Sequence, residues 1–125
     1  MRKSVVAASI SGLVLLAAPA YAQWIPGSEI VGQSIQVDTN GVVNTISFDP
    51  GGVARISSPG GMVVQGTWTA ANNQLCLQTA TGQECWPYQS AFQAGQPVTL
   101  VSSCQSSSRW TALSTNQAPG GGERG

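Results

Sequence analysis

The sequence lacks histidine altogether, and its single lysine, Lys3, stands close to the N-terminus. Without histidine, Ser-His-Asp triads and Cys-His nucleophile pairs are excluded. Because no lysine follows residue 3, Ser-Lys dyads and Schiff bases are excluded from the rest of the chain. Of the common catalytic arrangements, only a pair of carboxylates remains.

Acidic side chains are few, and for the two aspartates turn-capping is a simpler role than catalysis. Asp38 and Asp49 bracket one predicted strand, and each starts a turn motif, where an aspartate side chain usually caps the backbone. Glu84 is expected to be a solvated residue near a hairpin tip. The glycine pairs lie in hairpin turns rather than between a strand and a helix, so phosphate-loop and dinucleotide motifs are absent. We therefore expect no enzyme, no catalytic residues and no cofactor.

Basic residues are too few to form a patch. Residues 23–125 carry three arginines against five acidic side chains, a net charge of −2. Nucleic-acid binding depends on clustered Lys and Arg that neutralise phosphates, and a polybasic membrane contact needs the same residues. Both kinds of partner are excluded by this composition.

The N-terminal residues have the three parts of a secretory signal peptide. Met1-Arg2-Lys3 is a charged start, residues 5–18 are small and apolar, and Ala20-Tyr21-Ala22 is an Ala-x-Ala cleavage site. The apolar run is shorter than the roughly 20 residues that a membrane-spanning helix needs. We expect a signal peptide over residues 1–22, and a periplasmic or secreted protein that begins at Gln23 and has no membrane span.

After residue 23, turn motifs rich in Gly, Pro, Asn and Asp recur at short intervals. Between them lie short segments rich in Val, Ile, Thr and aromatic residues, several of which alternate between apolar and polar side chains. Val31, Ile35 and Val37, for example, share one face of the first segment. Such alternation predicts an all-β fold. Eight strands are expected near residues 30–37, 42–48, 53–57, 62–69, 74–78, 83–88, 97–103 and 108–113.

Short loops favour antiparallel neighbours, so we expect one small up-and-down barrel, with a two-sheet β-sandwich as the alternative. Closure into a barrel would also remove exposed strand edges, in a chain with few charges to protect them. Residues 23–113 form the predicted β domain. The Gly- and Pro-rich residues 114–125 have no apolar face to bury and are expected to be a disordered tail.

Cys76 and Cys85 fit a disulfide across a hairpin. If they face each other, paired residue numbers sum to 161, so the turn centres between Ala80 and Thr81, and Leu75 opposes Trp86 on the core face. Exported proteins meet oxidising conditions that favour disulfides. Closing so short a loop contributes about 2–3 kcal/mol.

Cys104 offers a second pairing, because a Cys85–Cys104 register also centres on a plausible turn. We favour Cys76–Cys85, since the shorter hairpin is easier to close. The third cysteine is then a free thiol or forms an intermolecular bridge. No metal site is expected, because zinc ligands are usually closely spaced Cys and His residues, and the Cys-x-x-Cys of redox pairs is absent.

Aromatic residues supply candidates for ligand contact. Most large rings of a small domain belong in its core. Tyr88 and Phe92 stand next to a long connection and are candidates to line a mouth, and Arg109 beside Trp110 could serve a carboxylate or a stacked ligand. The candidate ligand-contact residues are Trp86, Tyr88, Phe92, Arg109 and Trp110.

Two resemblances involve the same part of the chain. Gly66-Thr67-Trp68 is similar to the Gly-x-Trp of lipocalin and avidin barrels, but it lies mid-chain here, and we interpret it as a packing device in which a glycine gives room to a ring. The order Gly66-x-Trp68, Leu75-Cys76-Leu77 and Cys85-Trp86 resembles uncharacterised small exported β proteins of Gram-negative bacteria. That resemblance implies a small exported β domain and no activity. It points to no characterised family.

Binding is the class of function left open. We expect a non-enzymatic β domain that binds a protein or a small ligand in the periplasm or outside the cell. The alternative is a structural envelope protein without a small ligand, which forms a homodimer through its unpaired cysteine. Exposed aromatic residues left over once the core is filled would favour the first interpretation.

Overall fold

Alternating apolar side chains and tight turns produce eight strands and no helix in the computed structural model, which describes residues 23–116. The predicted signal peptide and residues 117–125 of the predicted tail lie outside the described residues. The strands are β1 (Gln33–Thr39), β2 (Val42–Phe48), β3 (Val53–Ser57), β4 (Val63–Ala71), β5 (Gln74–Thr79), β6 (Gly82–Pro87), β7 (Val98–Val101) and β8 (Ser107–Ala112).

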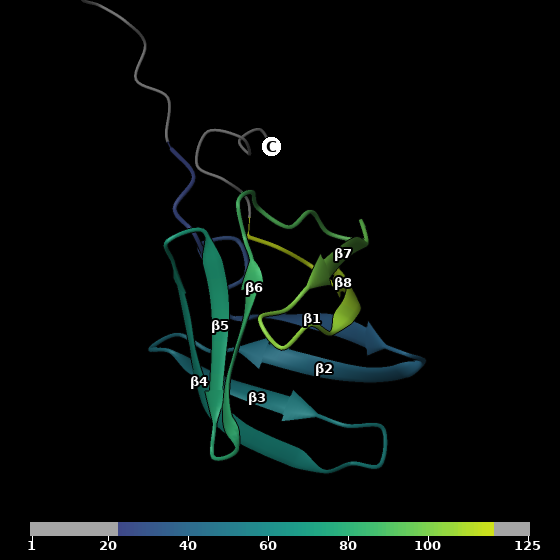
Figure 1. The fold of residues 1–125 in the computed structure, drawn as a ribbon. Coiled ribbons are helices and arrows are strands. Elements are labelled where there is room, and N and C mark those ends of the chain that lie inside the picture. Colours follow the sequence, from purple (N-terminus) through teal and green to yellow (C-terminus); the bar gives the residue numbers. More distant parts are fainter. Residues whose placement is uncertain (1–22, 117–125) are drawn as a thin grey trace, which may run out of the picture.

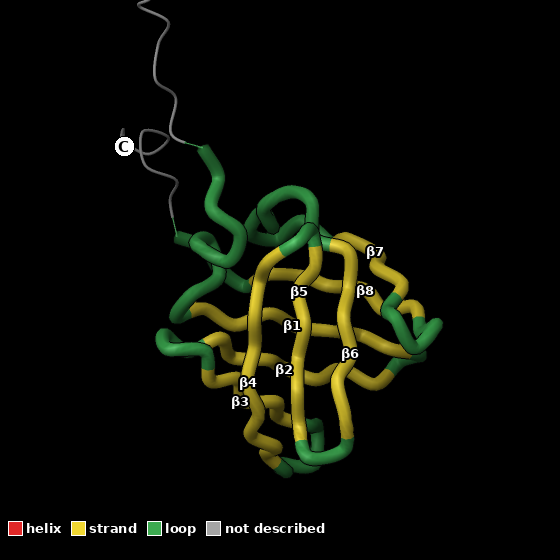
Figure 2. The backbone as a smooth tube through the Cα atoms, turned by 60° about the vertical axis from the view of Figure 1, so that its left-hand side comes forward, coloured by secondary structure: helices red, strands yellow, loops and turns green. Residues whose placement is uncertain are grey.

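All eight strands belong to one antiparallel sheet in the order β6-β5-β4-β3-β2-β1-β8-β7. Strands that follow one another in sequence pair in the sheet, except β6 and β7, which are its two end strands, and β8 also pairs with β1. The sheet coils on itself, so that β4, β5 and β6 cross over β1, β2 and β3 (Figures 1 and 2). The result is the predicted barrel, nearly closed, rather than two separate sheets.

The seam between the two end strands, β6 and β7, is closed by one residue of the β7–β8 turn. The Ser103 N–H donates to the Cys85 carbonyl at 2.8 Å, and the Cys85 N–H donates to Ser103 Oγ at 3.0 Å. Cys85 stands opposite Cys76 in β5. The backbone groups of Cys85 that point away from β5 therefore find both of their partners in Ser103.

The predicted boundaries of β2 and β3 are confirmed, whereas β1 starts at Gln33 and not near residue 30. Successive turns occupy the preceding residues, with hydrogen bonds such as Ile30 N–H to the Gly27 carbonyl at 3.2 Å. Gly27 and Gly32 hold positive φ angles of 92° and 77°, which suit glycine. Val31 thus lies in a turn and not on the face of β1.

The core fills the interior of the barrel and consists of one cluster that includes most of the large rings. Edge-to-face and stacked contacts join Trp24 to Tyr88, Tyr88 to Phe92, Phe92 to Trp110 and Trp110 to Trp86. The buried apolar residues are Ile30, Ile35, Val37, Ile46, Phe48, Ala54, Leu75, Leu77, Trp86, Tyr88, Phe92, Trp110 and Ala112.

Strand β4 turns the corner of the barrel at Gly66. Its first half pairs with β3, and its second half pairs with β5. A Cβ at Gly66 would overlap the carbonyl oxygen of Gln78 in β5, so the missing side chain admits a backbone crossing. The predicted role of Gly66, room for a ring, is wrong. Gly27 has that role, because a Cβ there would lie 3.0 Å from the Trp68 ring.

Residues 114–116 fall within the predicted tail, but Asn116 forms hydrogen bonds to the N-terminal turns of the described chain. Its N–H donates to the Glu29 carbonyl at 2.8 Å, and its Nδ2 donates to the carbonyls of Ser28 and Val31 at 3.0 and 2.8 Å. Its Oδ1 accepts from Gln33 Nε2 at 2.7 Å. These hydrogen bonds hold Asn116 against the N-terminal turns and the start of β1.

Candidate ligand-binding site

An open cavity of about 460 Å³ lies at the end of the barrel where the β5–β6 hairpin turns. In Figure 2 this hairpin tip is at the bottom, opposite the described chain ends. Apolar side chains from β3, β4 and β5 line the cavity beside hydroxyl and amide groups. The lining residues are Asn44, Ile56, Ser58, Val64, Leu77, Thr79, Thr81, Gly82, Gln83, Glu84, Trp86 and Cys104. A mouth of this composition in a small barrel is a common place for a small-molecule site.

Trp86 contributes an unusual group to this cavity wall. The other three indole N–H groups donate within the protein: Trp24 to Glu29, Trp68 to the Asp49 carbonyl and Trp110 to Ser108, at 2.9, 3.0 and 2.9 Å. The indole N–H of Trp86 is buried and has no acceptor among the described residues. Leaving a buried donor unpaired costs about 1–3 kcal/mol, so such a group needs an explanation.

Glu84 is the one charged residue of the cavity lining. It lies on β6 two residues before Trp86, and therefore on the same face of the strand. Glu84 is half-buried in the cavity lining, so it is less exposed than the solvated position that the sequence predicts. Neither arginine of residues 23–116 lies in this lining. No cation of the described residues in this lining therefore balances the charge of Glu84.

The predicted disulfide is confirmed. Cys76 and Cys85 are directly opposed, with Cα atoms 4.0 Å apart, and they are bonded through their sulfurs. Leu75 opposes Trp86, as the register predicts, and both side chains are buried in the core. Cys104 is the free cysteine; it is exposed in the β7–β8 turn and lines the rim of the cavity.

The five predicted ligand-contact residues separate in the structure. Trp86 lines the cavity, and Trp110 is completely buried in edge-to-face contact with Trp86. Tyr88 and Phe92 are core residues that also line a small hollow of about 70 Å³ beside β7. Arg109 is exposed, whereas its neighbour Trp110 points inward, because adjacent residues of a strand face opposite sides. Arg109 and Trp110 therefore do not form one site.

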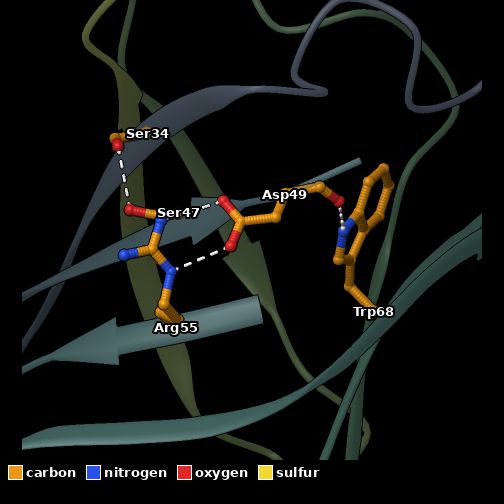
Figure 3. Close-up of polar contacts among 5 residues, drawn as sticks. All are labelled: Ser34, Ser47, Asp49, Arg55 and Trp68. Carbon is orange, nitrogen blue, oxygen red and sulfur yellow. Dashed lines mark hydrogen bonds and ion pairs between the residues drawn. The ribbon is translucent and has the colours of Figure 1, made fainter. Parts of the chain in front are cut away.

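Asp38 and Asp49 have different roles, although both were expected to cap turns. The Gly41 N–H donates to Asp38 Oδ1 at 2.9 Å, which confirms the cap. Asp49 does not cap a turn with its side chain, because Arg55 Nε and Nη2 donate to its two carboxylate oxygens at 2.8 and 3.0 Å (Figure 3). The hydrogen bonds from Arg55 lower the pKa of the Asp49 carboxyl and raise that of the guanidinium.

The same outer face carries a polar contact between neighbouring strands: the hydroxyls of Ser34 and Ser47 share a hydrogen bond of 3.1 Å (Figure 3). Beside it the Asp49 carbonyl accepts from the Trp68 indole. Ser34, Ser47, Asp49 and Arg55 thus pair with one another on the outside of the barrel, whereas the Trp68 ring packs against the core.

Glu29 is a buried carboxylate that the sequence did not reveal. Its side chain accepts from Trp24 Nε1 at 2.9 Å, from the Tyr88 hydroxyl at 2.6 Å and from the Phe92 N–H at 2.9 Å. Tyr88 in turn accepts from the Gly27 N–H at 2.9 Å. Burial and the hydrogen bond to Glu29 raise the pKa of Tyr88 above its usual value. These hydrogen bonds hold the N-terminal segment against the barrel. The polar side-chain groups of Glu29, Trp24 and Tyr88 all have partners in this cluster.

Residues 23–116 contain no group of three or more His, Cys, Asp or Glu side chains arranged to hold a metal ion. No helix in that part of the chain is long and apolar enough to cross a membrane.

Comparison of the chain with protein-family models, with curated proteins and with solved structures finds no significant match. This agrees with the expectation that no characterised family accounts for the sequence. None of the aromatic side chains of residues 23–116 is exposed, so the expected sign of a ligand-binding surface, exposed aromatics left over from the core, is not met. The case for a function therefore rests on the cavity and its chemistry.

Proposed function

We propose that this protein is an exported, non-enzymatic barrel that binds a small ligand in the cavity at the β5–β6 end. The observation that carries the proposal is Trp86, whose side chain lines the cavity and whose buried indole N–H has no acceptor among the described residues. A ligand with a hydrogen-bond acceptor would satisfy this donor, and its apolar part would cover Ile56 and Leu77. The disulfide is typical of the oxidising periplasm or cell exterior.

The roles of the carboxylates support binding over catalysis. Asp38 caps a turn, Asp49 pairs with Arg55, and the carboxylate of Glu29 is buried among its donors. Glu84 is the single acid among the cavity-lining residues. Hydrolysis by a carboxylate pair needs two acids across one substrate.

Native mass spectrometry of the protein recovered from its own host tests this proposal. We expect mass in excess of the polypeptide, which corresponds to a retained ligand. Ser58→Phe fills the cavity, because Ser58 belongs to its lining, and should abolish the extra mass. Ser57→Phe, one residue earlier and outside the lining, is the matched control and should retain it. A bare polypeptide in the unsubstituted protein would contradict tight ligand retention.

Cys104 favours a second candidate, a structural homodimer, because its free thiol is exposed in a turn. An inter-chain disulfide would double the mass in the same spectrum, and reductant would return it to the monomer value. Cys104→Ser should prevent the doubling without affecting the Cys76–Cys85 bridge. A monomer without reductant would dispose of this candidate.

A further inference from the structure

We infer that the ligand of this cavity carries a positive charge and that Glu84 is its counter-ion. The inference rests on the proposed function and specifies its ligand class: a small, mainly apolar amine with a hydrogen-bond acceptor. Three properties of the cavity lead to it, namely the unpaired donor of Trp86, the unpaired negative charge of Glu84 and the apolar wall near them.

The charge of Glu84 is not compensated by the described part of the chain. Arg55 and Arg109 are the cations of residues 23–116. Arg55 is engaged with Asp49 on the outer face, and Arg109 is exposed on the outer face of β8. A half-buried carboxylate with no cation attracts an ammonium group and repels a carboxylate. Fatty acids and other anions are therefore poor ligands for this cavity.

The spacing of Glu84 and Trp86 limits the size of the ligand. The two residues lie on the same face of β6 and are separated by two strand positions, a rise of about 6.6 Å. Leu77 stands opposite Glu84 in the register of β5 and β6, and Ile56 and Val64 add apolar surface across the cavity. A compact ring with an acceptor at one end and an ammonium group at the other suits two residues at this spacing along the strand.

Three matched probes share the para-acetylphenyl ring and a methylene group and differ in the charge of the group it carries: para-(aminomethyl)acetophenone, para-(hydroxymethyl)acetophenone and para-acetylphenylacetate. Each has the same carbonyl acceptor. Binding is followed by ¹H–¹⁵N NMR of the labelled full chain, freed of any co-purified ligand, through the four indole N–H signals of its four tryptophans. The Trp86 signal, identified by its loss in Trp86→Phe, should move most, because the other three described indoles already have acceptors.

We expect the amine to bind about three-fold more tightly than the alcohol, which is typical of a partly exposed ion pair, and the carboxylate to bind most weakly. Glu84→Gln should remove this order and leave the three affinities similar. Asp38→Asn, which removes one negative charge from the outer face while keeping an acceptor for the turn, should leave the order unchanged.

The outcomes separate the inference from the proposed function. If all three probes move the Trp86 signal with equal affinity, the cavity binds ligands but the role of Glu84 is refuted. If the amine preference persists in Glu84→Gln, the charge is recognised elsewhere and the inference is also refuted. If no probe moves the Trp86 signal, the inference fails, while the mass of the protein from its host decides the proposed function independently.

Discussion

At the scale of single residues, Glu29 is the notable case, because its carboxyl group is buried in the core. None of the described cations lies beside it. Glu29 is 6% exposed, and three donors surround its side chain. Hydrogen bonds to a charged acceptor are stronger than those to a neutral one, and three of them offset much of the cost of burial. The stability of the N-terminal segment therefore depends on these hydrogen bonds.

Tyr88 gives this cluster a dependence on alkaline pH. Its pKa is raised, first by burial and then by Glu29, so the folded chain keeps a proton that the unfolded chain loses above about pH 10. The contribution of Tyr88 to the free energy of unfolding is fully present below that pH and is lost as the pH rises. We expect the free energy of unfolding, from urea titrations at pH 8 to 11, to fall by at most about 1.4 kcal/mol per pH unit above pH 10.

Tyr88→Phe is the control for this prediction. It should lower stability at neutral pH, because Glu29 and the Gly27 N–H each lose a partner. It should also flatten the decline above pH 10. Both proteins should carry Cys104→Ser, which prevents exchange between the free thiol and the disulfide. If the free energy of unfolding of Tyr88→Phe falls equally steeply above pH 10, a group other than Tyr88 causes the fall.

At the scale of elements, β4 decides how the sheet closes. It serves two partners, β3 along its first half and β5 along its second, and Gly66 marks the change. Gly66 does not have a positive φ, so its importance comes from the approach of the Gln78 carbonyl and not from its backbone conformation. A side chain at this position would push β5 away from β4.

Gly66→Ala should therefore cost at least about 2 kcal/mol of folding free energy, because the obstacle is backbone that cannot rotate aside. Gly60→Ala is the matched control. Gly60 also lacks a positive φ, and a Cβ there would meet nothing within 4 Å, so its effect should be within about 0.5 kcal/mol. Urea denaturation compares the two, and equal midpoints would contradict the crossing described for β4.

Sequence patterns located the elements well, because the information they need is local. Alternation and turn residues are read within a few positions, and the Cys76–Cys85 register follows from a hairpin that contains both partners. The start of β1 was wrong because consecutive turns end only at Gly32, after apolar residues that fit a strand pattern. Apolar alternation does not distinguish a strand from a buried run of turns.

The candidate site was only partly predictable, because its residues meet through long-range contacts. Trp86 was identified as a candidate, but no local pattern separates its unpaired indole from the paired indoles of Trp68 and Trp110. Glu29 receives its donors from Trp24, Tyr88 and Phe92, two of them about sixty positions away. Only the return of the chain over the barrel brings these groups together.

At the scale of the whole molecule, the two ends of the described chain form one unit. Asn116 holds the N-terminal turns through three side-chain hydrogen bonds and one backbone bond. Gln33 takes part from the start of β1 and also accepts a hydrogen bond from Ser114. The closing strand β8 is thus secured beyond its last pair with β1.

Asn116→Ala should lower the free energy of unfolding by about 1–2 kcal/mol, because two carbonyls and one amide lose their partner in a partly buried position. Thr115→Ala, which removes a neighbouring side chain of similar burial, should have a smaller effect. Urea denaturation monitored by tryptophan fluorescence provides the comparison. Equal losses for the two variants would mean that the side-chain bonds of Asn116 contribute little.

The two ends of the described chain lie at the same pole of the barrel, which affects how a tethered molecule would be oriented. The β5–β6 tip lies at the other pole (Figure 1). The cavity is lined by residues of this tip, such as Thr79 and Thr81. A tether fixed to either end, whether a sensor surface or a second protein, would hold the barrel with its mouth facing outward. The orientation of the immobilised molecule is thus set by its topology, and solutes would reach the cavity without passing the support.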